Sequence, residues 1–162
     1  MPDMLVNLLR LPPLEPSLEE VKGAGFVVRR AQPWELTPVR EFVARHFDRA
    51  WADEISVGFA RQPLTVFVAL RDGRLAGFAA YECTRKNFFG PTGVVERERG
   101  RGLGRALLLA SLWALRESGY AYAIIGGVGP AAFYERAVGA TIIHGSAPGI
   151  YADPLRADAA HE

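Results

Sequence analysis

The chain has 162 residues, about the length of one domain, and 49% of them are hydrophobic and 23% charged. This composition is typical of a folded globular protein and excludes disordered and fibrous classes. The formal net charge of +1 argues against nucleic-acid binding through a surface-wide basic field, so an anion site has to be local.

The first 24 residues form a proline-punctuated leader with a short strand expected at 5–9. Two consecutive prolines interrupt its apolar run before it reaches signal-peptide length, and no stretch approaches the ~20 apolar residues of a membrane span. No linker follows. We therefore expect one domain over residues 1–162, with 1–24 packed on it as an extension and a polar tail at 152–162.

Residues 26–30 read as the next strand, and apolar residues at helical spacing predict a helix after Pro33 and a second one from about Trp51. The runs 65–70 and 75–82 read as strands. The Asp-Gly pair between them is a strong hairpin signal.

The second half alternates strands and helices around a glycine-rich loop. Residues 88–95 read as a strand that bulges or bends at its Gly-Pro pair, and a helix is expected over 103–117. A strand at 121–125, a helix at 130–137 and a last strand from 140 to about 144 follow. After the leader, the predicted order is β-α-α-β-β-β-α-β-α-β.

The loop at 96–105 has the features of an anion site. It carries four Arg against two Glu, and its glycines at 100, 102 and 104 leave the backbone open to close approach. A strand end, a glycine turn and a helix start bring free N–H groups and the positive end of the helix dipole together. Phosphate or pyrophosphate is the expected ligand.

Three glycine motifs are candidates for this loop. A P-loop requires a Gly-Lys pair, which the chain lacks, and the dinucleotide fingerprint requires G-x-G-x-x-G in the first βαβ unit, which this spacing does not match. Arg99-x-x-Gly102-x-Gly104 after Val94-Val95 instead resembles the pyrophosphate motif of the GNAT superfamily of acyl-CoA-dependent N-acyltransferases.

Two further features carry the resemblance. The element order is similar to the GNAT order, and "FYERAVGA" at 133–140 is similar to the family's "FYxxxGF", with one residue inserted and Ala140 in place of the final aromatic. The resemblance covers about residues 26–151. It implies an α/β (α+β) fold, GNAT-like, with a mixed, mostly antiparallel central sheet and helices on both faces.

The resemblance also implies acetyl-CoA as acyl donor, no metal, and a set of cofactor contacts. Val94 and Val95 are expected to bind pantetheine through the main chain, with the Val95 N–H stabilising the thioester oxygen, and Phe133 is expected to pack on CoA. The pyrophosphate is expected at Arg99, Gly100, Arg101, Gly102, Leu103, Gly104 and Arg105.

Direct attack of an amine in a ternary complex is the reaction that the resemblance implies. Tyr134 matches the family's usual acid for the leaving thiolate, although it can equally be a packing residue. Glu82 is the first candidate for the base, and the alternative is a solvated strand-end carboxylate. Tyr81, His46 and Glu54 are further candidates, and a relay of ordered waters is another route.

The acceptor is expected to be a small-molecule primary amine, with an amino sugar guessed first. Its pocket is predicted between the early helices, the 85–89 turn and the tail at 146–151. The expected lining comprises Trp51, Phe59, Phe88, Phe89, Tyr151, Arg85, Glu54 and Glu82.

Two hypotheses from other classes remain. The domain can be a non-catalytic acyl-CoA sensor, or its arginine loop can bind RNA or DNA, against which the low net charge counts. The lone Cys83 fits a reducing cytoplasm, and three scattered histidines (His46, His144 and His161) predict no metal site. We expect no nucleic-acid or membrane partner. The apolar leader and the last strand are candidate surfaces for a homodimer.

Overall fold

The computed structural model describes residues 1–156, which fold around one seven-stranded mixed sheet. The strands are β1 (Met4–Asn7), β2 (Val27–Arg30), β3 (Val66–Arg71), β4 (Arg74–Tyr81), β5 (Phe88–Val94), β6 (Tyr122–Ile125) and β7 (Thr141–Ile142). The α-helices are α1 (Glu15–Gly23), α2 (Leu36–His46), α3 (Arg49–Phe59), α4 (Leu103–Glu117) and α5 (Ala131–Val138).

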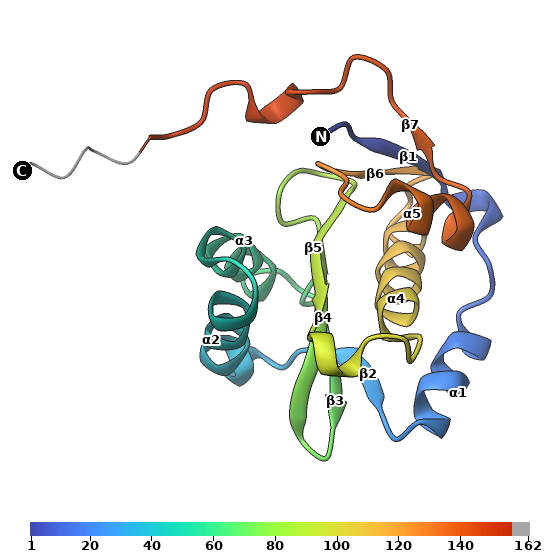
Figure 1. Ribbon diagram of the computed structural model, residues 1–162, viewed down its shortest axis with the longest axis vertical. Coiled ribbons are helices and arrows are strands. Elements are labelled where there is room, and N and C mark those ends of the chain that lie inside the picture. Colours follow the sequence, from blue (N-terminus) through green and yellow to red (C-terminus); the bar gives the residue numbers. More distant parts are fainter. Residues whose placement is uncertain (157–162) are drawn as a thin grey trace, which may run out of the picture.

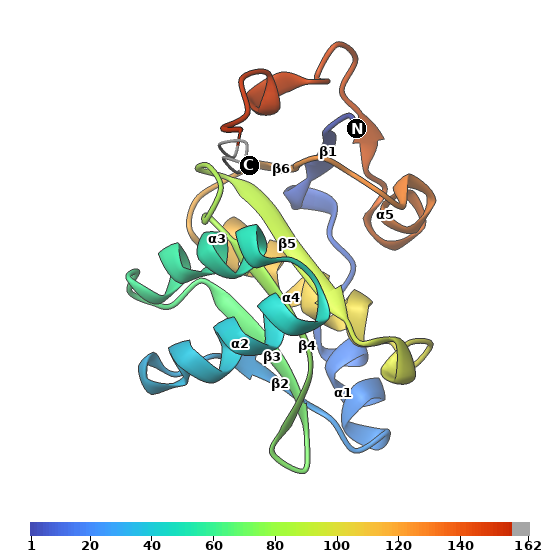
Figure 2. The same ribbon diagram turned by 60° about the vertical axis from the view of Figure 1, so that its left-hand side comes forward.

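The strand order is β2-β3-β4-β5-β6-β1-β7, and neighbours are antiparallel except β5 and β6, which are parallel. Helices α2 and α3 cover one face of the sheet, and α4 with α1 covers the other (Figure 1, Figure 2). Each face has its own hydrophobic cluster. The mostly antiparallel sheet with helices on both faces is as predicted.

Local sequence signals account for the hairpin between β3 and β4. Asp72 and Gly73 both have positive φ, +50° and +73°, as a two-residue type I′ turn requires. The helix at 103–117 is also as predicted, and ten of its residues are buried, so α4 is the central helix of its layer.

The leader differs from the expectation. Residues Glu15–Gly23 form helix α1 on α4, and Pro16 lies in the first turn, where its missing N–H costs no helical bond. The predicted strand ends at Asn7, because the Asn7 side chain accepts a hydrogen bond from the Leu9 N–H and starts a 3-10 turn. No helix was predicted in this part of the leader.

Strand β1 lies inside the sheet, between β6 and β7 and antiparallel to both (Figure 1). Met4, Val6 and Leu8 are fully buried in the core of the chain. They are thus not free to form the dimer surface that was considered for the leader, whereas Leu5 and Leu9 stay exposed.

The sheet splits open beside β5. Tyr81 pairs with Phe89 and Ala79 with Thr92, so Gly90 and Pro91 face one β4 residue and form the predicted bulge. Strands β5 and β6 pair only at Phe88–Ile124 and Phe89–Ile125. Past the bulge, β5 continues to Val94 paired with β4, and its edge toward β6 is unpaired.

The C-terminal part has one further difference. The last strand covers only Thr141–Ile142 rather than reaching residue 144. The predicted tail lies partly, and His161 entirely, outside the described residues. Between residues 1 and 156, no helix is both long and apolar enough to cross a membrane.

Candidate functional site

A cleft of about 680 Å³ lies where β5 and β6 diverge. Its walls come from β5, the glycine loop, the first turns of α4, the loop at 126–130 and α5. Eight of the ten predicted cofactor residues line it: Val94, Arg99, Gly100, Gly102, Leu103, Gly104, Arg105 and Phe133. The tertiary structure therefore brings most of the predicted set to one surface.

The N-terminus of α4 is open at one end of this cleft. Gly102 is the N-cap, with φ +82°, and no side chain caps the first turn, so the first helical N–H groups keep their capacity to bind an anion. A Cβ on Gly104 would meet only the Phe133 ring, at 3.8 Å. The backbone is thus bare at the point where a phosphate fits.

The loop arginines have different environments. The Arg99 Nε donates to the Val94 carbonyl at 3.2 Å, and Arg105 lines the cleft. Arg101 does not line it, because its Nε lies 3.2 Å from the Oε2 of Glu98. The other Glu98 oxygen accepts from Arg71 of β3 at 2.5 Å. Glu98, only 6% exposed, thus fastens the loop to the sheet.

Val95 has a different role from the one predicted. Its N–H donates to the Ala76 carbonyl in the β4–β5 ladder at 2.9 Å, and its side chain is buried in the α2–α3 cluster. It therefore cannot also stabilise a thioester oxygen. Since alternate residues of an antiparallel strand turn their N–H groups to opposite sides, the Val94 N–H faces the open side.

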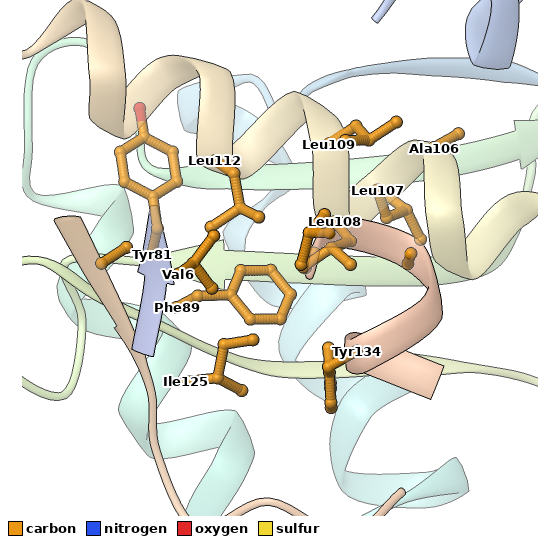
Figure 3. Close-up of a cluster of buried hydrophobic side chains, with 14 of the residues drawn as sticks. Val6, Tyr81, Phe89, Ala106, Leu107, Leu108, Leu109, Leu112, Ile125 and Tyr134 are labelled. Carbon is orange, nitrogen blue, oxygen red and sulfur yellow. The ribbon is translucent and has the colours of Figure 1, made fainter. Parts of the chain in front are cut away.

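Tyr134 projects from α5 into the same region. It is 6% exposed and lines the cleft, and its ring packs edge-on against Phe89 at 6.3 Å between centroids. Figure 3 shows Tyr134, Phe89 of β5, Ile125 of β6 and Leu108 of α4 in one cluster. Burial raises the pKa of Tyr134 to about 12, so the phenol carries its proton at neutral pH.

Glu82 lies outside the lining of the cleft. Its Oε1 accepts a hydrogen bond from the Asn87 N–H at 2.6 Å and closes the β4–β5 turn. The nearby Glu82 carboxylate also raises the pKa of the Tyr120 phenol. The geometry gives no support to the base role predicted for Glu82, because the carboxylate serves this turn.

A second compartment of about 360 Å³ adjoins the cleft. Of the predicted acceptor-pocket residues, Trp51, Glu54, Phe89 and Tyr151 line it, joined by Thr84 and Pro148. Phe59, Phe88, Arg85 and Glu82 do not. Within residues 1–156, no three His, Cys, Asp or Glu side chains gather as a metal site.

Leu108 and Glu98 are among the cleft residues that sequence reasoning missed. Leu108 lies one turn after Gly104, so helical spacing from the glycine motif points to it. Glu98 has no such local signal, because its partner Arg71 is far away in sequence.

A mixed sheet that opens beside an uncapped helix N-terminus is the arrangement expected from the resemblance to acyl-CoA-dependent N-acyltransferases. Residues 62–137 match the model of the acetyltransferase (GNAT) domain. This part of the chain is therefore similar to a GNAT acetyltransferase domain. No curated protein matches it in sequence.

Several solved structures share the fold. One is a GCN5-related glucosamine N-acetyltransferase region in a fungal multi-domain GH3 β-N-acetylglucosaminidase, with TM-score 0.72 and 17% identity over 88% of this chain and 19% of that one. Another is a GCN5-related N-acetyltransferase from Sphaerobacter thermophilus, with TM-score 0.66 and 20% identity over 88% of this chain and 48% of that one. A third is a GNAT family acetyltransferase from Brucella melitensis in complex with acetyl-CoA, with TM-score 0.57 and 21% identity over 73% of this chain and 86% of that one. The chain thus spans about a fifth of the length of the fungal protein and about half of the length of the Sphaerobacter protein.

Proposed function

We propose that the protein transfers an acetyl group from acetyl-CoA to a primary amine of a small molecule, by direct attack in a ternary complex. The observation that carries this proposal is the cleft itself. It joins an anion-binding helix N-terminus, a strand with an unpaired edge and a neutral phenol along one continuous surface.

The cleft residues fit CoA along its length. The N–H groups of the first turn of α4, with Arg99 and Arg105, suit the pyrophosphate. The free edge of β5 suits the amide groups of pantetheine, and Phe133 offers an apolar wall. When bound, acetyl-CoA supplies the thioester carbonyl that the amine attacks.

The reaction requires stabilisation of developing charge. Negative charge grows on the carbonyl oxygen as the nitrogen–carbon bond forms, and we assign its stabilisation to the Val94 N–H. As the carbon–sulfur bond breaks, the Tyr134 hydroxyl donates its proton to the leaving thiolate, and the proton that the attacking nitrogen loses returns through water to the Tyr134 oxygen. Its raised pKa suits this role, because the phenol keeps its proton until the sulfur needs it.

The acceptor amine enters from the second compartment, which meets the cleft at Phe89, Gly90 and Pro91. An amino sugar is the first substrate to test. It is the guess made from sequence, and one structural neighbour is described as a glucosamine N-acetyltransferase region, although only 17% identical. The buried, unpaired Cys83 fits action in the cytoplasm.

The test is calorimetric titration of the protein with acetyl-CoA, with NADH and ATP as controls. We expect selective binding of acetyl-CoA, followed by thiol release when amines are added. Binding without thiol release from any amine would favour the non-catalytic sensor. Binding of NADH or ATP in its place would overturn the assignment of the cleft.

The variant Gly104→Val tests the loop in the same titration. There is room for a Cβ at position 104, so we expect the variant to fold. Its side chain should block the phosphate from the backbone N–H groups. Loss of these charge-assisted hydrogen bonds should weaken acetyl-CoA binding by about 10- to 100-fold. Gly23→Val, at the end of α1 with no atom near its Cβ, is the control. Gly102→Val is less informative, because valine rarely adopts the positive φ of Gly102 and would strain the loop whether or not it blocks a phosphate.

A further inference from the structure

The second compartment is small and largely apolar. Trp51 of α3, Phe89 of β5 and Tyr151 of the C-terminal segment supply aromatic surface, and Pro91 and Pro148 add to it. Trp51 and Glu54 lie three residues apart on α3, so they share one face of the helix. A volume of about 360 Å³ is within the range of small-ligand pockets.

The charged side chains of this compartment are of one sign, and the amino group of Met1, a residue that is 75% exposed, is a cationic main-chain group beside them. Glu54 and Tyr151 are the ionisable side chains among its described lining residues. Glu54 accepts a hydrogen bond from the Thr84 hydroxyl, which orients the carboxylate. Burial, together with the charges of Glu54 and Asp3, raises the pKa of Tyr151, so that phenol stays neutral.

Cationic side chains lie near this compartment without lining it. Arg85 is exposed, and its Nη1 donates to the Thr84 carbonyl. Its charge reaches Tyr151, where it lowers the pKa, but burial and the two carboxylates outweigh it. The lining therefore offers a carboxylate and aromatic faces to a cation and no guanidinium or ammonium side chain to an anion.

We infer that Glu54 binds the ammonium group of the acceptor and that the acceptor is a monoamine whose body carries no charge. This inference rests on the proposed function and deepens it. A free amino acid is disfavoured, because no side chain of the lining offers its carboxylate a positive charge and the amino group of Met1 belongs to a residue that is 75% exposed to water. A sugar phosphate amine is disfavoured for the same reason, and a polyamine would leave its second charge without a carboxylate.

The experiment measures amine binding without turnover. Calorimetry of the CoA-saturated protein would use glucosamine, cyclohexylamine and tyramine as uncharged-body amines, with glucose and cyclohexanol as counterparts that lack the ammonium. Glucosamine 6-phosphate, glutamate and spermidine test the charged bodies. We expect at least one uncharged-body amine to bind, and its alcohol and charged counterparts to bind at least about 10-fold more weakly.

The variant Glu54→Gln tests the carboxylate. We expect the bound amine to lose about 10- to 100-fold in affinity while the affinity for acetyl-CoA is unchanged. Asp53→Asn is the matched control, since Asp53 is the next residue of α3 and pairs with Arg40 at the surface. It should bind the amine like the wild type.

The outcomes separate this inference from the proposed function. Wild-type affinity of Glu54→Gln for the amine, preferential binding of glucosamine 6-phosphate or glutamate, or no binding of any uncharged-body amine would overturn the inference. Failure of acetyl-CoA to bind, or absence of thiol release, would instead count against the proposed function.

Discussion

The surroundings of Tyr134 support the acid role that we propose for it. Tyr134 is buried beside Phe89 and Phe133 at the wall of the cleft, whereas Tyr120 lies near the Glu82 carboxylate, outside the cleft lining. Burial alone raises the pKa of Tyr134 to about 12. The side chain is therefore a proton donor across the ordinary pH range, as long as it contacts the leaving sulfur.

The replacement Tyr134→Phe keeps both aromatic contacts and removes the hydroxyl. We expect kcat, measured by thiol release, to fall by about 10²- to 10⁴-fold, while the affinity for acetyl-CoA stays unchanged. Because the raised pKa keeps the phenol neutral below about pH 12, wild-type kcat should not decline between pH 8 and 10. Tyr120→Phe is the control. A wild-type kcat in Tyr134→Phe would reduce Tyr134 to a packing residue.

At the scale of elements, residues of other strands and helices contact the glycine loop and position it. Arg71 of β3 stacks over Phe26 at 4.8 Å and donates to Glu98, and Glu98 lies beside Arg101. On the other side, Glu20 of α1 lies against Gly102. The start of α4 is therefore positioned by β3 and α1, which the motif itself does not contain.

Glu98→Gln should loosen this attachment. The two arginines are more than a third exposed, so we expect a modest loss of about 1–2 kcal/mol in the free energy of unfolding, together with weaker acetyl-CoA binding. Urea unfolding and calorimetry measure the two effects. Glu96→Gln, an exposed position in the same turn, should match the wild type. Equal stability of both variants would argue against the attachment.

At the scale of the whole molecule, the leader completes the sheet and the site wall. Strand β1 pairs with β6 and β7, and the Asp3 carboxylate accepts the Gly127 N–H at 2.8 Å. The Pro2 carbonyl accepts from Val128. The loop at 126–130, which lines the cleft, is thus held by residues from the opposite end of the chain.

We expect the chain to unfold as one cooperative unit. Met4→Ala should cost about 2–5 kcal/mol, the usual range for a fully buried methionine, and urea unfolding should show one transition by circular dichroism and by tryptophan fluorescence. Leu5→Ala, on the exposed side of the same strand, is the control. A Met4→Ala curve that leaves the fluorescence transition unmoved would make the leader a separate unit.

The sequence by itself predicted most of the helices and strands and the glycine loop before α4, because their signals are local. Apolar periodicity marked α2, α3 and α4, the Asp-Gly pair marked the hairpin, and Gly90-Pro91 marked the bulge. The spacing Arg99-x-x-Gly102-x-Gly104 located the start of α4. Each of these depends on contacts within a few residues or on allowed backbone angles.

Only the tertiary structure decided which groups face the cleft. Val94 and Val95 look equivalent in sequence. In the structure the Val95 N–H donates to β4, whereas the Val94 N–H faces the open side of β5. Glu82 and Glu54 were both candidates, yet Glu82 closes a turn while Glu54 faces a compartment built from α3 and the C-terminal segment. Strand β1 also found its place between distant strands. Pairings across long sequence separations leave no local pattern, because they depend on how the whole sheet closes.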